Sequence, residues 1–180
     1  MVQTQIRYIT PFALDKNIGR EYNQAIYELP DDCFVVLRDG DTMFLTPDWG
    51  NQIEQIIKAN QDYEVITCMT NRIGVRECLL YSEFMDKPIE KQIEIAETCW
   101  LDHKTDVKQA LVAPGMLMIF HKSIWAKHKF RENSIIFDRQ FSNDVIRSGG
   151  KIGVAKGLYI FHLYRFCQEN PQSYTKHLKK

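Results

Sequence analysis

The first part of the chain alternates between short apolar runs and apolar residues spaced three or four positions apart. Residues 6–10 form a β-rich run closed by a proline, and residues 33–37 form a continuous apolar run, typical of a strand covered on both faces. Between these runs, apolar residues at helical spacing predict an amphipathic helix that begins near Asn17 and ends before Pro30. The pattern therefore predicts a strand, a helix and a second strand.

The same alternation continues through the next segment. Thr46 and Pro47 are residue types that favour an N-cap and a first helical position. The apolar face of the helix that follows is formed by Trp49, Ile53, Ile56 and Ile57. A further strand is predicted at residues 64–70. This order favours a single-domain α/β fold, in which right-handed crossovers connect a mostly parallel central sheet flanked by helices.

The second half of the chain has a less regular pattern. Residues 71–86 predict only a short element. After Pro88, a helix is predicted whose buried face is formed by Ile89, Ile93, Ala96 and Trp100. The other predicted elements are a strand at 111–120 interrupted by Pro114 and Gly115, helices at 123–128 and 138–148, and a strand at 152–166. We expect one domain over residues 1–166 and an exposed C-terminal tail at 167–180.

Composition narrows the class of protein. The chain has 180 residues, of which 44% are hydrophobic, enough for one sizeable core. Its 23 basic and 23 acidic residues cancel, so no net charge would attract nucleic acid or an anionic membrane surface. The sequence has neither the apolar length of a membrane span nor the N-terminal pattern of a signal peptide. We therefore expect a cytoplasmic protein without nucleic-acid partners or integral membrane contact; peripheral membrane contact and the oligomeric state stay open.

The cysteines are consistent with that location. They are Cys33, Cys68, Cys78, Cys99 and Cys167. Their number is odd, they lack C-x-x-C spacing, and several lie inside apolar runs. We predict reduced thiols that serve as small core residues.

The apolar run at 33–37 is followed, after one arginine, by the turn Asp39-Gly40-Asp41. Two carboxylates separated by one small residue can converge on a hard cation, and Gly40 allows the chain to turn tightly. Ligands of α/β sheets bind at the carboxyl ends of strands, where this turn is predicted to lie. The alternative is an ordinary solvated turn, which is what an isolated D-G-D sequence most often forms.

Further motifs follow in a fixed order around this turn. Residues 17–26 have the pattern N-x-G-x-x-x-N-x-A-I, and residues 31–41 contain the apolar run that ends in D-G-D. The segments downstream are 114–125, 137–142 and 150–153. Together these motifs, which span most of the chain, resemble family-2 glycosyltransferases with the GT-A fold. The resemblance implies divalent-metal-dependent transfer of a sugar, with inversion, from a UDP- or GDP-linked donor to a saccharide or other hydroxyl acceptor.

The resemblance also implies roles for individual residues. Asp39, Asp41 and His162 would hold Mn²⁺ or Mg²⁺. Asp138 would be the general base that accepts the proton of the acceptor hydroxyl. The implied donor-binding residues are Thr10, Pro11, Phe12, Asn17, Arg20, Asn23, Arg38 and Gly40. The implied acceptor or sugar contacts are Gly115 and Trp100.

Several of these residues have a structural alternative. His162 could be a core histidine bonded to a backbone carbonyl, and Asp138 could be the N-cap of a helix. Asn17 could cap its helix and Arg20 could be a solvated surface charge. The helical spacing of Trp100 favours burial in the core over stacking on a sugar.

The chain departs from the family near its first strand. In typical members a helix, a strand and a nucleobase-binding aspartate precede the N-x-G helix, whereas here only a short loop joins Pro11 to Asn17. Nucleobase recognition is then reduced, provided by Asp15 or another residue, or lost, and the chain is a minimal, truncated or inactive relative. The alternative functions are a sugar nucleotidyltransferase, for which residues 11–19 contain too few glycines and basic residues, and a non-catalytic carbohydrate- or nucleotide-binding module.

Overall fold

Most of the predicted elements are present in the computed structural model, which describes residues 5–81 and 84–164. The strands are β1 (Ile6–Ile9), β2 (Phe34–Arg38), β3 (Thr42–Phe44), β4 (Val65–Thr70), β5 (Val107–Ala110), β6 (Leu117–His121) and β7 (Ile152–His162). The helices are α1 (Ile18–Tyr27), α2 (Trp49–Ala59), α3 (Ile89–His103), α4 (Lys122–His128) and α5 (Phe137–Arg147), with a 3-10 turn, η1, at Arg76–Cys78. The sequence pattern missed β3 and β5, and the tail predicted at 167–180 lies outside the described residues.

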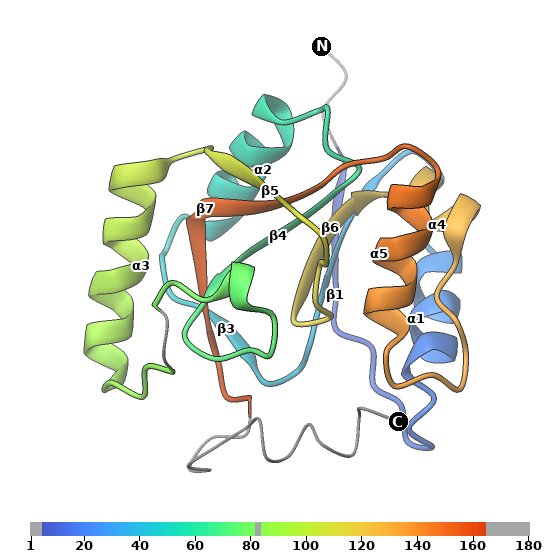
Figure 1. Ribbon diagram of the computed structural model, residues 1–180, viewed down its shortest axis with the longest axis horizontal. Coiled ribbons are helices and arrows are strands. Elements are labelled where there is room, and N and C mark those ends of the chain that lie inside the picture. Colours follow the sequence, from blue (N-terminus) through green and yellow to red (C-terminus); the bar gives the residue numbers. More distant parts are fainter. Residues whose placement is uncertain (1–4, 82–83, 165–180) are drawn as a thin grey trace.

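The strands form one mixed sheet in the order β1-β2-β6-β4-β7-β3, with β5 also paired to β7. Figure 1 shows α3 on one side of this sheet and α1, α4 and α5 together on the opposite side. Within the described part, β1–β2 and β4–β7 are parallel, whereas β2–β6, β4–β6, β3–β7 and β5–β7 are antiparallel. The domain is thus α/β as predicted, but the prediction of a mostly parallel sheet is wrong.

The direction of β6 follows from the loop that precedes it. Residues 111–116 bring the chain to the carboxyl end of β2, where the carbonyl of Met116 accepts a hydrogen bond from the Asp39 amide at 3.2 Å. β6 must then run back from that edge, antiparallel to both β2 and β4. Because β2 and β4 are both antiparallel to β6, and β7 is parallel to β4, the carboxyl ends of β2, β4 and β7 lie at one edge.

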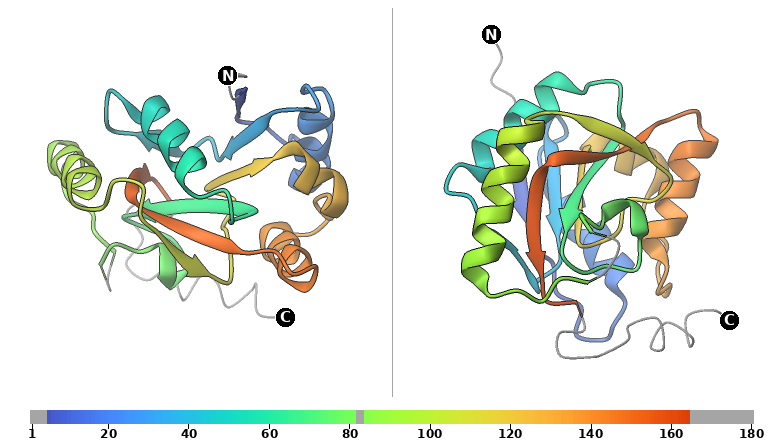
Figure 2. Two further views of the ribbon diagram at one scale, coloured as in Figure 1. Left: turned by 90° about the horizontal axis from the view of Figure 1, so that it is seen from above. Right: turned by 60° about the vertical axis from the view of Figure 1, so that its left-hand side comes forward.

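β7 changes neighbours along its length. The first part of β7 pairs with β5, which lies beside it in Figure 2, and its last part pairs with β3. The register between β7 and β4 shifts between Cys68 and Met69. At this irregularity Gly157 lies against the residue that follows α3, since an added Cβ would be 2.0 Å from the carbonyl oxygen of Lys104. Only glycine fits there. The shift lets the end of β7 reach β3 at the carboxyl edge.

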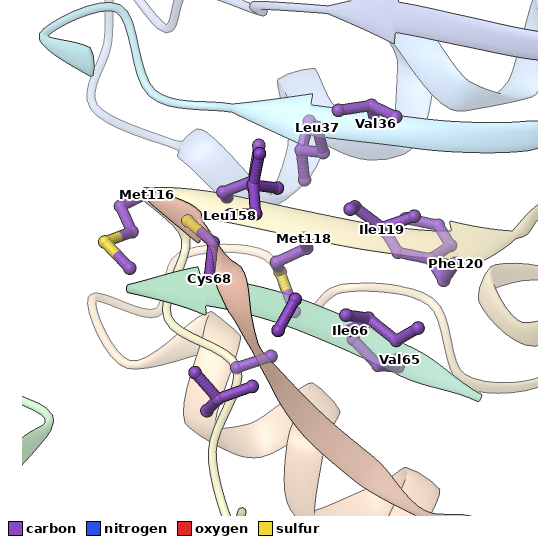
Figure 3. Close-up of a cluster of buried hydrophobic side chains, with 14 of the residues drawn as sticks. Val36, Leu37, Val65, Ile66, Cys68, Met116, Met118, Ile119, Phe120 and Leu158 are labelled. Atoms are coloured by element: carbon purple, nitrogen blue, oxygen red, sulfur yellow. The ribbon is translucent and has the colours of Figure 1, made fainter. Parts of the chain in front are cut away.

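The hydrophobic core lies on both sides of the central strands. All six residues of β4 are buried, as are the three central residues of β2, so the prediction that β2 is covered on both faces is confirmed. Figure 3 shows side chains of β2, β4, β6 and β7 packed together. Burial of this kind contributes roughly 25 cal/mol per Å² of apolar surface. The sheet therefore provides a rigid support for the loops at its edge.

Two local predictions need correction. On the predicted buried face of α3, Ala96 is buried and Trp100 packs against the core, but Ile89 is 38% exposed, and Gln92 and Cys99 are buried as well. Gln92 tolerates burial because its side chain accepts a hydrogen bond from the Tyr159 hydroxyl at 2.5 Å and donates to the carbonyl of Met85 at 2.9 Å.

Thr46 does not cap α2. Its hydroxyl donates to Oε1 of Gln52 at 2.8 Å, and the helix begins at Trp49, after Asp48. Thr46 lies two residues before the N-cap position, which is occupied by Asp48, so its hydroxyl is not placed to cap the first helix amides.

The cysteines of the described residues are free and buried: Cys33, Cys68, Cys78 and Cys99. Burial raises the pKa of each of these thiols. Cys167 lies outside the described residues. In the part of the chain that the structure describes, no helix has the length and apolar character needed to cross a membrane.

Candidate metal centre

The acidic turn and the end of β7 are brought together by β3. Thr42, the first residue of β3, lies opposite His162 in an antiparallel pair, and the amide of Leu163 donates to the carbonyl of Asp41 at 2.9 Å. The ligand atoms of Asp39, Asp41 and His162 all lie within 4.8 Å of one another. Three residues from two distant parts of the sequence thus form one cluster.

A hydrogen bond fixes the tautomer of the neutral His162 ring. The side chain is 2% exposed, and Nδ1 lies 2.8 Å from the carbonyl oxygen of Arg72. A carbonyl can only accept, so Nδ1 carries a proton and donates it. Nε2 faces the carboxylate of Asp41 at 3.3 Å. In the neutral ring Nε2 then has a free lone pair for a metal ion, and in the imidazolium it forms an ion pair with Asp41.

Both interpretations of His162 therefore describe part of its environment. It is a core histidine bonded to a backbone carbonyl, and it also faces the acidic turn. A carbonyl partner on the far ring nitrogen is the usual way in which proteins orient a metal-binding histidine.

Asp39 is half-buried and is held in place by α1. The hydroxyl of Tyr22, a buried residue of that helix, donates to Oδ1 of Asp39 at 2.6 Å. Burial raises the pKa of Asp39, and the charges of Asp41 and Asp138 act in the same direction, while the Tyr22 hydrogen bond and His162 act against it. The pKa of Asp41 is lowered, chiefly by its hydrogen bond with His162.

The donor set fits a hard or borderline divalent cation. Two carboxylates and one imidazole are ligands that suit Mn²⁺, and carboxylates suit Mg²⁺. Tyr22 occupies one oxygen of Asp39 and leaves the other available. The cluster could thus hold Mn²⁺ or Mg²⁺, although carboxylates at a surface also occur without a bound ion.

Asp138 lies in the first turn of α5 and is not its N-cap. The helix is preceded by Ile136, and Asp138 accepts hydrogen bonds from the amides of Arg139 at 2.7 Å and Gly115 at 3.2 Å. Burial raises the pKa of Asp138, and the two amide bonds oppose the shift. A carboxylate of this kind is a stronger proton acceptor than an exposed one.

Gly115 connects Asp138 to the acidic turn. An added Cβ would be 3.1 Å from the ring of Phe137 and 3.8 Å from Oδ1 of Asp39. Asp39, Gly115, Asp138 and His162 all line one cavity of about 610 Å³. This volume is in the range of pockets that bind small organic molecules. Two of the three residues predicted for the metal, Asp39 and His162, thus share one cavity with the predicted base.

The residues of the N-x-G motif, by contrast, attach α1 to the loop before α5. Asn17 caps α1 by accepting from the Arg20 amide, and it also accepts from the amide of Asn133 at 2.9 Å. Gly19 lies so close to this loop that an added Cβ would be 2.2 Å from the carbonyl oxygen of Arg131. The prediction that Asn17 is a helix cap is confirmed.

Asn23 and Arg20 are likewise engaged with protein groups. The Asn23 side chain binds the amide and carbonyl of Phe130 and the indole N–H of Trp125, at 2.8–2.9 Å. Arg20 pairs with Asp15 at 2.9 Å and with Glu21 at 2.8 Å. These contacts give both residues a structural role; donor binding by them stays a prediction.

The remaining donor-side residues lie around the acidic turn. Arg38 donates to the hydroxyl of Thr10 at 3.1 Å and to the carbonyl of Thr42 at 2.8 Å, and Thr10 is also the nearest neighbour of Gly40, whose added Cβ would be 3.8 Å from its methyl group. These contacts tie the end of β1 to the turn.

Pro11, Phe12 and Trp100 are less closely connected with the cluster. Pro11 is partly buried and Phe12 is 78% exposed, in the loop that follows β1. Trp100 packs against the core from α3, as its spacing predicted, and is not among the residues that line the cavity.

Three contributors to the site were missed from the sequence: Tyr22, Asn71 and Arg72. Oδ1 of Asn71 accepts from the His162 amide at 2.8 Å, and the carbonyl of Arg72 orients the ring. Both residues come directly after β4, where they form a polar pair that is itself buried. The rule that placed Asp39 at a strand end would have placed them too.

A scan of protein-family models finds no match to this chain, and a search of curated proteins finds none either.

Proposed function

We propose that this protein is a divalent-metal-dependent glycosyltransferase that transfers a sugar from a nucleotide-sugar donor to a hydroxyl acceptor, with inversion. One observation carries the proposal: Asp39 and His162, two members of the cluster with Asp41, line the same cavity as the half-buried carboxylate of Asp138. Such a reaction requires a group that stabilises the leaving diphosphate and a group that accepts a proton, and this cavity has candidates for both.

The proposed step assigns one role to each part of the cavity. Asp39, Asp41 and His162 would hold Mn²⁺ or Mg²⁺, which when bound neutralises the charge of the leaving diphosphate. Asp138 accepts the proton of the acceptor hydroxyl while the hydroxyl oxygen of the acceptor forms a bond to the anomeric carbon. The bond between that carbon and the diphosphate oxygen breaks, and the diphosphate leaves with the electron pair. The raised pKa of Asp138 makes it a better base for this step.

The nucleobase contributes less to this donor site. Asp15, the candidate replacement for the usual base-binding aspartate, accepts a hydrogen bond from the Asn17 amide at 3.1 Å and pairs with Arg20. These bonds within the loop leave its carboxylate committed to the protein. We therefore expect the cation and the diphosphate to provide most of the donor affinity, with weak discrimination between UDP- and GDP-linked sugars.

Calorimetric titration with UDP- and GDP-sugars, with and without Mn²⁺, tests the proposal. We expect binding that requires Mn²⁺, followed by slow hydrolysis of the donor. Asp41→Ala should abolish the metal-dependent binding, whereas Asp32→Ala, at a carboxylate that is 96% exposed near the start of β2, should leave it unchanged. Unchanged Mn²⁺ affinity in Asp41→Ala would refute the metal centre. Failure of the unaltered protein to bind any donor would favour the non-catalytic relative.

The base is tested separately. Asp138→Asn should keep metal-dependent donor binding and lose donor turnover, because the amide cannot accept the proton. Donor turnover is measured as release of free nucleotide diphosphate. An Asp138→Asn protein that turns over the donor at the rate of the unaltered protein would exclude Asp138 as the base.

A further inference from the structure

Six of the residues that line the cavity have branched aliphatic side chains. We call this set the apolar wall; it consists of Ile18, Ile73, Val75, Val112, Ile135 and Ile136. These residues come from the start of α1, the loop after β4, the loop before β6 and the loop before α5. The carboxylates of Asp39 and Asp138 line the same cavity. The cavity is therefore amphipathic, with charged groups beside an aliphatic surface.

Part of the apolar wall is open to solvent. Ile135 is 68% exposed, Ile136 is 38% exposed and Ile18 is 36% exposed, whereas Ile73 is buried. Scattered apolar residues on a surface need no explanation, but apolar residues that line one cavity and are also exposed indicate a binding surface. The wall therefore includes both a buried residue and residues that solvent can reach.

The wall is held in place by the N-x-G motif. Asn17 bonds to the backbone and side chain of Asn133 at 2.9 and 3.1 Å, and Gly19 is in close contact with Arg131. Figure 1 shows the loop before α5 lying beside the start of α1. These contacts fix Ile135 and Ile136 relative to Ile18 before any ligand arrives. A preformed surface needs less ordering when it binds.

The chemistry of the wall selects its occupant. Its side chains carry no hydrogen-bond donor or acceptor, so sugar hydroxyls pressed against it would lose water without replacement, at about 1–3 kcal/mol for each group. An aliphatic chain in the same place would instead gain from leaving water. A free oligosaccharide acceptor therefore suits this wall poorly.

We propose that the acceptor is an amphiphile: its hydroxyl lies at Asp138 and its aliphatic chain lies along the apolar wall. The inference rests on the proposed glycosyl transfer for the role of the hydroxyl. Binding of the chain depends on the wall alone, so it can be measured without metal or donor.

Alkyl β-D-glucopyranosides with chains from methyl to octyl, used below their critical micelle concentrations, are suitable probes. In protein labelled at isoleucine δ1-methyl groups, NMR titration should shift Ile18, Ile73, Ile135 and Ile136. Affinity should rise about fourfold for each methylene that enters the wall. The methyl groups of Ile53 and Ile56, buried in α2, should not move. Equal affinity for methyl and octyl glucoside, or shifts spread equally over α2, would overturn the proposal.

A matched pair of variants locates the effect. Ile135→Asn should weaken octyl glucoside binding at least tenfold, whereas Leu101→Asn should not change it, although both side chains are 68% exposed. Equal affinity in the two variants would overturn the proposal. The proposal would also be overturned if the methyl shifts of Ile135 and Ile136 depended on protein concentration and not on probe concentration. A second copy of the chain would then occupy the wall.

The two proposals fail in different ways. Mn²⁺-dependent donor binding without chain-length dependence would refute the amphiphilic acceptor and leave the glycosyltransferase standing. Chain-length dependence without donor binding would refute the glycosyltransferase, and with it the role given to the acceptor hydroxyl.

Discussion

Replacing Asn23 with alanine distinguishes a structural role from a donor-binding role. Asn23 makes three hydrogen bonds, to the indole of Trp125 and to the amide and carbonyl of Phe130. Both aromatic residues are buried, so water cannot readily replace the lost partner. At about 1 kcal/mol for each bond the loss is about 3 kcal/mol, and the better helix propensity of alanine offsets roughly 0.6 kcal/mol of it. The expected loss in the free energy of unfolding is therefore about 2–3 kcal/mol.

Urea unfolding followed by tryptophan fluorescence measures this loss, and thermal unfolding should show a Tm lower by about 5–10 °C. Gln24→Ala is the matched control, because it changes the next residue of α1, which is exposed, and should stay within about 0.5 kcal/mol of the unaltered protein. If Asn23→Ala unfolds like the control but binds donor more weakly, the structural argument is wrong and the donor-binding role is right.

Two further predictions concern packing and protonation. Gly19→Ala should lower the free energy of unfolding by about 1–3 kcal/mol in urea, since its Cβ would lie 2.2 Å from the carbonyl oxygen of Arg131. Gly50→Ala, whose Cβ would have its nearest contact at 3.8 Å, should instead raise the free energy of unfolding by about 0.5–1 kcal/mol. Equal effects of the two substitutions would contradict the close contact at Gly19. Carboxyl-carbon NMR should find the pKa of Asp138 above the ordinary value of 3.8 and that of Asp41 below it. The folded state then binds the Asp138 proton more tightly than the unfolded chain does, so the contribution of Asp138 to stability falls as pH rises from about 3.8 through its raised pKa. The pKa of Asp41 is lowered in the folded state, so its contribution to stability falls as pH drops from about 3.8 through that lowered pKa. An Asp138 midpoint at or below 3.8 would contradict the effect of burial.

The sequence predicted long elements well and short ones poorly. Continuous or periodic apolar patterns located α1, β2, α2 and β4 to within a few residues. β3 and β5 have three and four residues, and with the sequences Thr-Met-Phe and Val-Lys-Gln-Ala neither contains an apolar run or period to be recognised. This matters for the site, because pairing between β3 and the end of β7 places His162 beside Asp41. The candidate ligands could be named from the sequence, but the geometry that brings them together could not be derived from it.

The same limit explains the N-x-G motif. Periodicity located its helix, but the partners of Asn17, Gly19 and Asn23 lie in the loop before α5, more than a hundred residues away. Sequence alone does not distinguish a side chain that bonds to a distant part of the backbone from a side chain that binds a ligand. Tyr22 is a similar case: its spacing predicted burial, but not the hydrogen bond to Asp39.

The electrostatics of the cavity support a functional explanation over a purely structural one. Asp39 and Asp138 are carboxylates whose pKa values burial raises, and Asp39 is raised further by the charge of Asp41. Like charges close together in a partly buried site lower stability, and proteins usually retain them where a ligand or a reaction uses them. A divalent cation would relieve the repulsion between Asp39 and Asp41, whereas Asp138, held by two backbone amides, would keep its proposed role as a proton acceptor. An aliphatic chain along the apolar wall would exclude water from these groups and strengthen each of their interactions.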